Sequence, residues 1–451
     1  MNGGETLLDA AREALAAARA RVEQAPVPVR RAGRVRRAVG LAIESRGPQV
    51  GVGEECRLET ADGDLLGMAE VVGFESGTVY SMPVDPVRGV RFGDRVVATG
   101  RQPTVPVGER LLGRVLDALG RPLDGRPLGP GPRRAIHGEP VRAMHRARIT
   151  EPMATGVRAI DGLVTIGRGQ RVGIFAGAGV GKSRLLGALA RHAADEIIVI
   201  ALVGERGREV RDFVEGELGE AGLRRAVVFV ATSDEPPVRR VRCALAATTV
   251  AEEFRRQGRN VTLLMDSLTR VAMALREIGL ATGEPPVTKG YPPSVFGFLP
   301  RLLERAGREQ GAGAMTGIYT VFVEGDDLDE PISDASRAIL DGHLVLSRAL
   351  FERAHFPAID VLASNSRVMP EVSDAGHLEA AALLRRMLAI HRESADLIAI
   401  GAYREGSDPE LDRAIAVVPK IEAFLRQDLS RPSPLDETRR QLAELAAGCA
   451  R

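Results

Sequence analysis

A glycine-rich segment, RVGIFAGAGVGKSRLL at residues 171–186, could bind phosphate groups. An apolar stretch leads into it, and Lys182 and Ser183 open a predicted helix. Glycines let backbone N–H groups turn inward around phosphate oxygens, and the helix N-terminus adds the positive end of its dipole. We expect Lys182 to reach the β- and γ-phosphates and the Ser183 hydroxyl to bind Mg²⁺. The predicted nucleotide-binding loop comprises Gly177, Ala178, Gly179, Val180, Gly181, Lys182, Ser183 and Arg184.

This loop departs from the strict phosphate-loop motif at one position. The motif G-x-x-x-x-G-K-[ST] begins with glycine, where this chain has Ala176. Alanine fits if the residue keeps an ordinary φ, so we expect a small cost. The alternative is a glycine turn that joins a strand to a helix without a ligand, but GKS after a predicted strand favours nucleotide binding.

Further charged residues follow predicted strands, where α/β sheets build their sites. Asp266 ends the apolar stretch VTLLM, and this Walker B arrangement would hold the Mg²⁺ shell. Glu205 and Arg206 follow IIVIALVG in the segment GERGREV. Phosphoryl transfer needs metal ligands, a group that orients water, and positive charge. Glu205 could polarise the attacking water and Arg206 could contact the γ-phosphate; an exposed charged loop is the alternative.

One more arginine, Arg367 in ASNSRVM, follows another predicted strand. Its chemistry alone leaves two roles open. It is either a salt-bridged arginine or a finger supplied to the site of a neighbouring subunit.

The elements that would position these groups change along the chain. From residue 170, continuous apolar strands alternate with helices, which predicts a mainly parallel sheet covered on both faces. Residues 33–100 have short apolar stretches between Gly, Pro and Asp-Gly turns, typical of a small antiparallel barrel or sandwich. Residues 120–150 are rich in Pro, Gly and Arg and read as a long connection. The last part of the chain reads as a helical bundle.

The N-terminal region predicts a helix, and the composition argues against several classes of protein. Residues 5–24 predict one helix, either partner-binding or solvated. The net charge of +1 argues against a nucleic-acid-binding protein. Three cysteines without a CxxC and scattered histidines favour free thiols in a reducing cytosol and no structural metal. No run of 18 apolar residues and no signal-peptide layout is present, so we expect a cytoplasmic protein.

Several long segments resemble the rotary ATPase family, in particular the ATPases of type III protein export. They are RVGIFAGAGVGKS, GERGREV, LLMDSLTRVAMALREIGLATGEPPVTKGYPPSVFGFLPRLLERAG, YTVFVEGDDLDEPISD and AILDGHLVLSRAL. The flagellum-specific export ATPases are the closer likeness, through RARITEPMATGVRAIDGL, TKGYPPSVF and GAYREGSDPELDRAI. Val271 and Leu275 stand where flagellar members tend to have Tyr and Gln, which weakens the likeness to that subfamily but leaves the chemistry untouched.

The resemblance implies a multidomain fold with a small N-terminal β-barrel, a central RecA-like α/β P-loop domain with a mainly parallel sheet, and a C-terminal α-helical domain. The boundaries it implies are residues 1–30 for the N-terminal helix and linker, 31–102 for the barrel, 103–375 for the ATPase domain and 376–451 for the helical domain. It also implies a homohexamer with ATP bound between subunits.

Residue roles follow from the same resemblance. Lys182 becomes the phosphate lysine, Ser183 and Asp266 the Mg²⁺ ligands, Glu205 the catalytic carboxylate, and Arg206 and Arg270 phosphate contacts. Arg367 matches the arginine finger that reaches into a neighbour's site. Phe356, in HFPAID, matches the position where the family packs an aromatic ring on adenine, with a core phenylalanine as the alternative.

The resemblance also implies partners. The N-terminal helix matches a segment that binds a regulatory stator-like export protein and has been linked to membrane lipid. The loop GEPPVTKGYPPSVF matches the part that faces a coiled-coil stalk protein in the ring pore, with Glu284, Lys289 and Tyr291 as expected pore-facing groups. A solvated Pro-rich loop is the alternative. Export chaperone–cargo complexes and peripheral contact with the export gate and the cytoplasmic face of the inner membrane are also expected, but no nucleic acid.

The function implied is Mg-ATP hydrolysis that drives or primes type III export, of flagellar components before injectisome cargo. A catalytic subunit of an ATP synthase would share the site, but those enzymes use two different chains. An RNA helicase would need stacking aromatics, whereas residues 33–100 offer only Phe74, Tyr80 and Phe92. A noncatalytic subunit would lack the carboxylate of Glu205.

Overall fold

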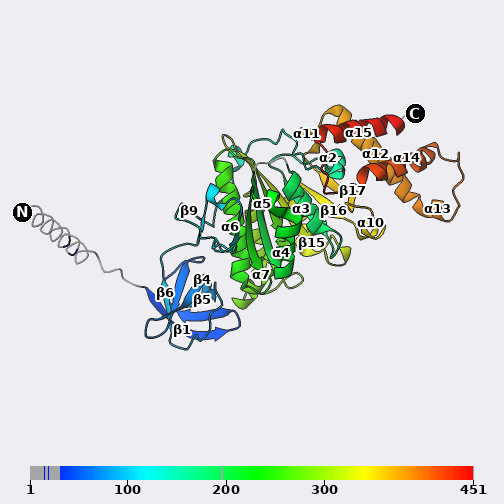
Figure 1. The fold of residues 1–451 in the computed structure, drawn as a ribbon. Helices are drawn as coiled ribbons and strands as arrows, with labels where there is room; N and C mark the ends of the chain where they lie inside the picture. Colours follow the sequence, from blue (N-terminus) through cyan, green and yellow to red (C-terminus); the bar gives the residue numbers. More distant parts are fainter. Residues whose placement is uncertain (1–14, 16–18, 20–30, 194–196, 450–451) are drawn as a thin grey trace, which may run out of the picture.

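The computed structural model describes residue 15, residue 19 and residues 31–193 and 197–449. Within these residues the chain forms three parts in a row, a β-barrel, a central α/β domain and a C-terminal helical domain (Figure 1). The predicted helix at residues 5–24 lies almost entirely outside the described residues. In the described part of the chain, no helix is long and apolar enough to cross a membrane.

Six antiparallel strands close the N-terminal barrel in the order β1-β2-β5-β4-β3-β6. Alternate residues such as Val35, Leu58 and Val71 point inward and form its core, as expected for strands with one buried face. The strands are β1 (Ala32–Val39), β2 (Ala42–Arg46), β3 (Glu55–Glu59), β4 (Leu65–Glu75), β5 (Thr78–Pro83) and β6 (Arg95–Ala98).

A nine-stranded sheet forms the centre of the molecule, with the main order β17-β16-β10-β15-β13-β11-β12-β8. Its strand pairs are parallel except β16 with β17 and β14 with β15. The strands are β8 (Arg114–Asp117), β10 (Arg171–Ala176), β11 (Ile197–Glu205), β12 (Ala226–Thr232), β13 (Val261–Asp266), β14 (Gly307–Arg308), β15 (Ala314–Phe322), β16 (Gly342–Leu346) and β17 (Ile359–Ser366).

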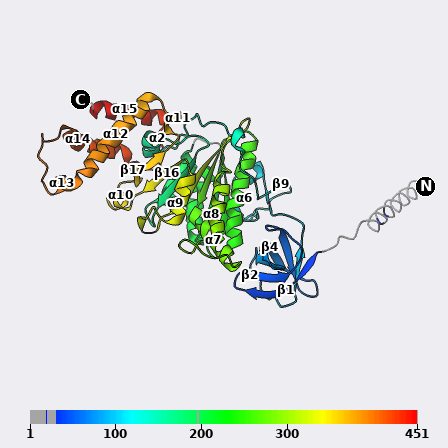
Figure 2. The same ribbon diagram turned by 180° about the vertical axis from the view of Figure 1, so that it is seen from behind.

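Helices cover both faces of this sheet, as the continuous apolar strands predict. One face carries α6 (Pro237–Arg256), α7 (Leu268–Ala281), α8 (Pro293–Leu303) and α9 (Pro331–Ile339) (Figure 2). The other carries α3 (Lys182–His192), α4 (Gly207–Asp212), the π-helical turn η3 (Phe213–Leu218) and α5 (Gly219–Leu223).

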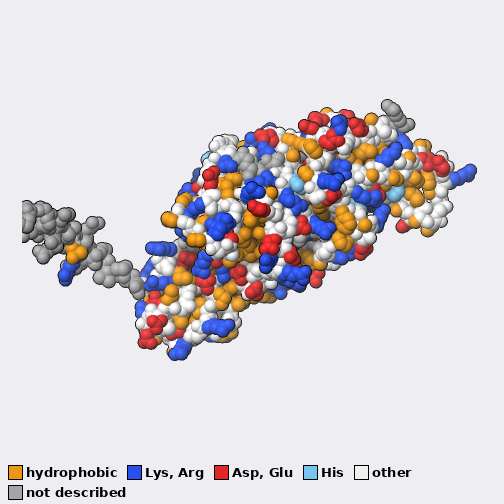
Figure 3. All heavy atoms as spheres, in the orientation of Figure 1, with side chains coloured by type: hydrophobic (Ala, Val, Ile, Leu, Met, Phe, Trp, Pro, Cys, Tyr) orange, Lys and Arg blue, Asp and Glu red, His pale blue; other side chains and the backbone are white. Residues whose placement is uncertain are grey.

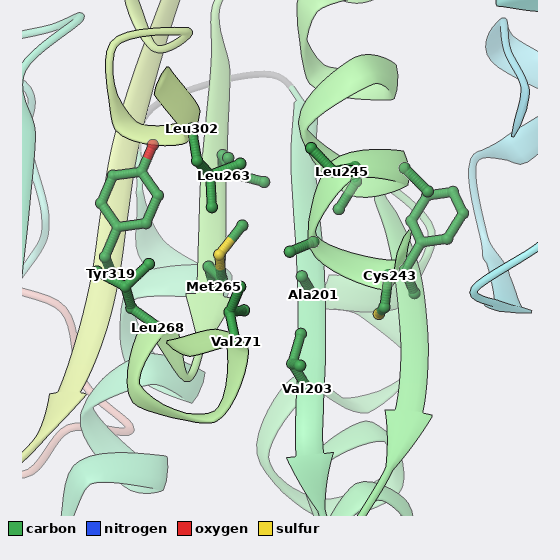
Figure 4. Close-up of a cluster of buried hydrophobic side chains, with 14 of the residues drawn as sticks. Ala201, Val203, Cys243, Leu245, Leu263, Met265, Leu268, Val271, Leu302 and Tyr319 are labelled. Atoms are coloured by element: carbon green, nitrogen blue, oxygen red, sulfur yellow. The ribbon is translucent and has the colours of Figure 1, made fainter. Parts of the chain in front are cut away.

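Strand β11 shows how the two layers are held together. Its residues Val199 and Ala201 enter the first core, and Ile198 and Ile200 enter the second. In the first core, Ala201 lies with Met265 among side chains of neighbouring strands and helices (Figure 4). A strand buried on both faces has no polar side, so it does not alternate in sequence.

The C-terminal part is a helical domain that shares the second core. It contains α11 (Met369–Val372), α12 (Ala375–Glu393), α13 (Ala395–Ala399), α14 (Pro409–Leu425) and α15 (Leu435–Cys449), and α2 (Arg158–Leu163) packs against α12, α14 and α15. Met387 and Phe424 belong to the same apolar cluster as Leu185 of α3. This shared core fixes the helical domain beside the phosphate loop.

The connection before the phosphate loop is more ordered than a simple linker. β8, which precedes the predicted connection at 120–150, pairs with β12 at the edge of the central sheet. Within the connection, β9 (Arg133–Ala135) pairs with β7 (Thr104–Pro106). Arg242 of α6 joins the barrel to the central domain, because it donates hydrogen bonds to Glu55 at 2.8 Å and Glu70 at 2.5 Å while its side chain is only 4% exposed.

Acidic and basic side chains are interspersed over the face of the molecule shown in Figure 3.

Candidate nucleotide-binding site

The glycine-rich loop lies between β10 and α3, as its sequence predicts. Gly179 and Gly181 have φ values of 76° and 92°, a region that L side chains rarely adopt. Ala176 is the last residue of β10 and pairs with strands on both sides, Phe322 on β15 and Leu346 on β16. Its backbone is therefore extended, which explains why alanine is accepted there.

Lys182 contacts carboxylates at the ends of two adjacent strands, β11 and β13. Its Nζ donates a hydrogen bond to Asp266 Oδ1 at 2.6 Å and to Glu205 Oε1 at 3.4 Å. Thr320 of β15 donates its hydroxyl to the same Asp266 oxygen at 2.6 Å. Burial disfavours the charge on Lys182, but the two carboxylates outweigh this effect and raise its pKa. The ammonium is therefore held in place at the carboxyl edge of the sheet.

Glu205 is aimed at this lysine by a bulge at the end of β11. The pairing with β12 shifts register between Val203 and Glu205, and Gly204 has a φ of 71°. A Cβ on Gly204 would lie 2.9 Å from Cβ of Arg270, so the position needs glycine for space as well as for φ. Bulges re-aim side chains in this way beside active sites.

Burial raises the pKa of Glu205 to about 7. The charge of Lys182 acts in the opposite direction, whereas Asp266 and Glu209 add to the increase. A carboxylate that titrates near neutrality can accept a proton from water at physiological pH, which suits a general base.

Glu209 of α4 is a functional candidate that the sequence analysis missed. It shares a hydrogen bond with Glu205, and this bond lowers the pKa of Glu209 while raising that of Glu205. The backbone N–H of Arg206 donates to Glu209 Oε2 at 3.4 Å. The one feature of the sequence that indicates this contact is the spacing of four residues between Glu205 and Glu209 in GERGREV, which lets the two carboxylates meet.

Other predicted contacts lie exposed around the loop. Ser183, Arg184, Arg206 and Arg270 are exposed and line the same cavity as Lys182 and Glu205. In the described part of the chain the Ser183 hydroxyl has no hydrogen-bond partner. A free hydroxyl and a nearby carboxylate, on Asp266, are the oxygen ligands that Mg²⁺ accepts beside phosphate, so these residues fit that ion.

The cavity has a volume of about 1090 Å³, large enough for a nucleotide. Away from the phosphate loop it is lined by Phe351 and Phe356, whose rings meet edge to face at 5.4 Å and 82°. Phe356 is 41% exposed, which removes the alternative of a core phenylalanine. Phe351 of α10 (Arg348–Glu352) was not singled out in the sequence, because only the fold brings it to its partner.

The helical domain completes this end of the cavity. The backbone N–H of Gln427 donates to the carbonyl of Phe356 at 2.8 Å, and its side chain donates to the carbonyl of Gly156 at 2.7 Å. The following residues 428–430 also line the cavity. No sequence motif marked this segment, since its role depends on the domain arrangement.

Arg367 lies apart from the other predicted groups. It follows β17, is exposed, and does not line the cavity of its own subunit. Its side chain makes no hydrogen bond or ion pair with any residue that the structure describes. The salt-bridged alternative is therefore absent within the described subunit, and the role of a finger for a neighbour stays a prediction.

The three expected pore-facing residues differ from one another. Lys289 is exposed and lies 3.8 Å from Asp327. Glu284 accepts hydrogen bonds from the N–H and hydroxyl of Ser294, at 2.8 and 2.5 Å, and so ties the loop to α8. Tyr291 is only 3% exposed, and Arg276 packs 5.4 Å from its ring centre. The expectation of a pore-facing Tyr291 is wrong, because the ring anchors the loop from inside.

Three family models match the chain. The nucleotide-binding domain of the ATP synthase alpha/beta family matches residues 156–366, and the beta-barrel domain of that family matches residues 35–100. The C-terminal domain of the T3SS EscN ATPase matches residues 373–444.

Known proteins are similar over almost the whole chain. The flagellum-specific ATP synthase of Bacillus subtilis is 50% identical over 420 residues, which cover 92% of this chain and 95% of the relative. The SPI-2 type 3 secretion system ATPase of Salmonella typhimurium is 49% identical over 395 residues, with 88% and 90% covered. The assembled ATPase EscN from the enteropathogenic E. coli type III secretion system is 44% identical with a TM-score of 0.87, over 92% of this chain and 100% of that structure. EscN in complex with its central stalk EscO gives a TM-score of 0.83 at 43% identity, over the same shares of the two chains.

Proposed function

The chain belongs to the ATP synthase alpha/beta family, in the group of flagellum-specific and type 3 secretion ATPases, and we propose that it hydrolyses ATP to drive flagellar protein export. It is an ATPase of protein export. The observation that carries the chemistry is the contact of Lys182 with both Asp266 and Glu205 beside the phosphate loop. The names of relatives such as those of Bacillus subtilis and Salmonella typhimurium support the flagellar assignment.

The residues divide the work of phosphoryl transfer between them. The backbone of the glycine loop and Lys182 bind the β- and γ-phosphates, and Arg206 and Arg270 add positive charge around them. Ser183 and Asp266 would hold Mg²⁺, which supplies further charge neutralisation when bound. Glu205 accepts the proton of the attacking water, and Glu209 raises the pKa of the Glu205 carboxylate. Phe356 packs on the base, with Phe351 against its edge.

The active form would be a ring of six identical subunits with ATP between neighbours. The exposed Arg367, outside its own cavity, would complete the site of the next subunit and stabilise the transition state. The assembled state of EscN and its complex with a central stalk support a ring whose pore holds a coiled-coil partner. A stator-like protein at the N-terminal segment, chaperone–cargo complexes and peripheral membrane contact at the export gate complete the proposal.

The test of this function replaces Glu205 with Gln in the full-length protein. Glu205→Gln keeps the shape of the side chain but cannot accept a proton, so hydrolysis should fall by about 10²–10⁴-fold while ADP binding persists. Phosphate release and calorimetric ADP titration measure the two properties. Near-normal turnover in the variant would remove Glu205 from its role.

The same substitution in the source organism identifies the export system. Loss of surface filaments and of secreted flagellin would support flagellar export. Intact filaments with loss of other secreted proteins would move the assignment to an injectisome, the alternative that type 3 secretion relatives at 44–49% identity keep open.

A further inference from the structure

Arg348, the first residue of α10, reaches the phosphate loop from outside the motif. Its Nη2 donates to the carbonyl oxygen of Ala178 at 3.4 Å. Its Nε donates to Asp326 Oδ2 at 3.3 Å. Asp326 closes the short turn η4 (Glu324–Asp326), which follows β15. One guanidinium therefore connects three segments, α10, the phosphate loop and the acidic turn after β15.

Gly177 shows how closely this ion pair packs against the loop. A Cβ on Gly177 would lie 2.6 Å from Asp326 Oδ1 and 3.1 Å from Arg348 Nη2. Unlike Gly179 and Gly181, Gly177 is not in the left-handed region. A side chain at this position would therefore displace the carboxylate and the guanidinium from the places that they occupy.

The charges of Asp326 and Arg348 indicate what the ion pair does beside the phosphate loop. A carboxylate beside a phosphate-binding loop repels the phosphates unless a cation offsets it. Arg348 and Asp326 are each 47% exposed, so solvent and salt screen their effect and its size should be modest. Among the described residues Asp326 has no other ion-pair partner, so the balance of charge at this side of the loop depends on Arg348.

We propose that Arg348 is a positioning residue of the phosphate loop, which holds the Ala178 carbonyl and neutralises the Asp326 carboxylate that packs on Gly177. The inference rests on the proposed ATPase activity and adds a residue to it. Arg348 acts on the nucleotide through the loop, so it affects binding of the phosphates more than the chemical step.

The test measures KM and kcat for Mg-ATP, and the Kd of ADP, in the full-length protein. Arg348→Gln leaves Asp326 uncompensated and should raise KM and Kd about five-fold, with kcat changed less than about two-fold. Arg348→Lys keeps the charge and should stay within about two-fold of wild type. Asp326→Asn should leave KM equal or lower, and adding it to Arg348→Gln should restore most of the lost affinity. Higher ionic strength should shrink the difference between Arg348→Gln and wild type.

Arg353→Gln is the matched control. Arg353 directly follows α10, is 67% exposed, and among the described residues forms its one ion pair with Glu422 at 3.5 Å, so its loss should leave KM unchanged. An Arg348→Gln protein with wild-type KM and Kd would overturn the inference. So would a rise in KM for Asp326→Asn, or a double variant no better than Arg348→Gln, because packing alone would then explain the arginine. Absence of hydrolysis in the wild-type protein itself would instead contradict the proposed function.

Discussion

Lys182 touches two carboxylates at once, and this contact defines the site at the scale of single residues. Asp266 and Glu205 leave the ends of different strands, so only a sheet with β11 beside β13 brings them to one ammonium. The raised pKa of Glu205 follows from burial, which the charge of Lys182 offsets only in part.

The pKa of Glu205 predicts how the activity depends on pH. With a pKa of about 7, Glu205 is protonated below neutrality and cannot accept a proton. The value of kcat/KM should therefore fall below pH 7, by about tenfold per pH unit, and level off above it. A pH profile of kcat/KM in the full-length protein measures this limb.

Substitution of Glu209 should shift the pH at which kcat/KM falls. Burial is the largest cause of the raised pKa, but the hydrogen bond with Glu209 adds to it. Glu209→Gln removes that carboxylate, so the midpoint of the acid limb should shift to lower pH. An unchanged or higher midpoint would show that Glu209 does not act on Glu205.

The sequence identified most of the residues that meet at this site. The glycine loop, Lys182, Glu205 and Asp266 all follow apolar strands in a parallel pattern, and that pattern forces their common edge. It could not identify Phe351 or Gln427, because the fold brings Phe351 to Phe356 and the packing of the helical domain brings Gln427 to the cavity. A motif records local chain geometry, whereas these contacts are tertiary.

At the scale of elements, the bulge at the end of β11 directs the side chain of Glu205 toward Lys182. Gly204→Ala should lower the free energy of unfolding by about 1–3 kcal/mol, because the φ of 71° and the stem of Arg270 both exclude a side chain. Relaxation of the bulge should also misplace Glu205 and reduce kcat. Denaturant unfolding and steady-state kinetics measure the two effects.

Gly207→Ala is the control for this prediction. Gly207 begins α4, has no atom within 4 Å of an added Cβ, and lacks a left-handed φ, so alanine should be neutral or stabilising. Equal stability losses at the two glycines would contradict the role of the bulge.

Element prediction failed where single strands or loops depend on distant neighbours. β8 is a four-residue strand whose pairing partner, β12, lies far along the chain, so no local pattern reveals it. Tyr291 lies in a Pro-rich loop that reads as exposed, yet its ring packs under Arg276 and beside Phe296. Composition gives the average environment of a loop and cannot show which of its side chains turns inward.

At the scale of the whole molecule, the separation of Arg367 from its own cavity is the central feature. The fold places Glu205 and Arg367 of one subunit in different surroundings, one lining the cavity and one exposed after β17. If neighbours share each site, Glu205→Gln and Arg367→Ala should each abolish turnover, for different reasons.

Mixing these two inactive proteins is the most direct measurement of the shared site. In a mixed ring, an Arg367→Ala subunit keeps its Glu205 and can receive the intact arginine of a Glu205→Gln neighbour. With random mixing at equal amounts, about one quarter of the interfaces should be complete and activity should return toward that fraction of wild type. Activity that stays at the level of the separate variants, in mixtures shown to form joint assemblies, would contradict catalysis between subunits.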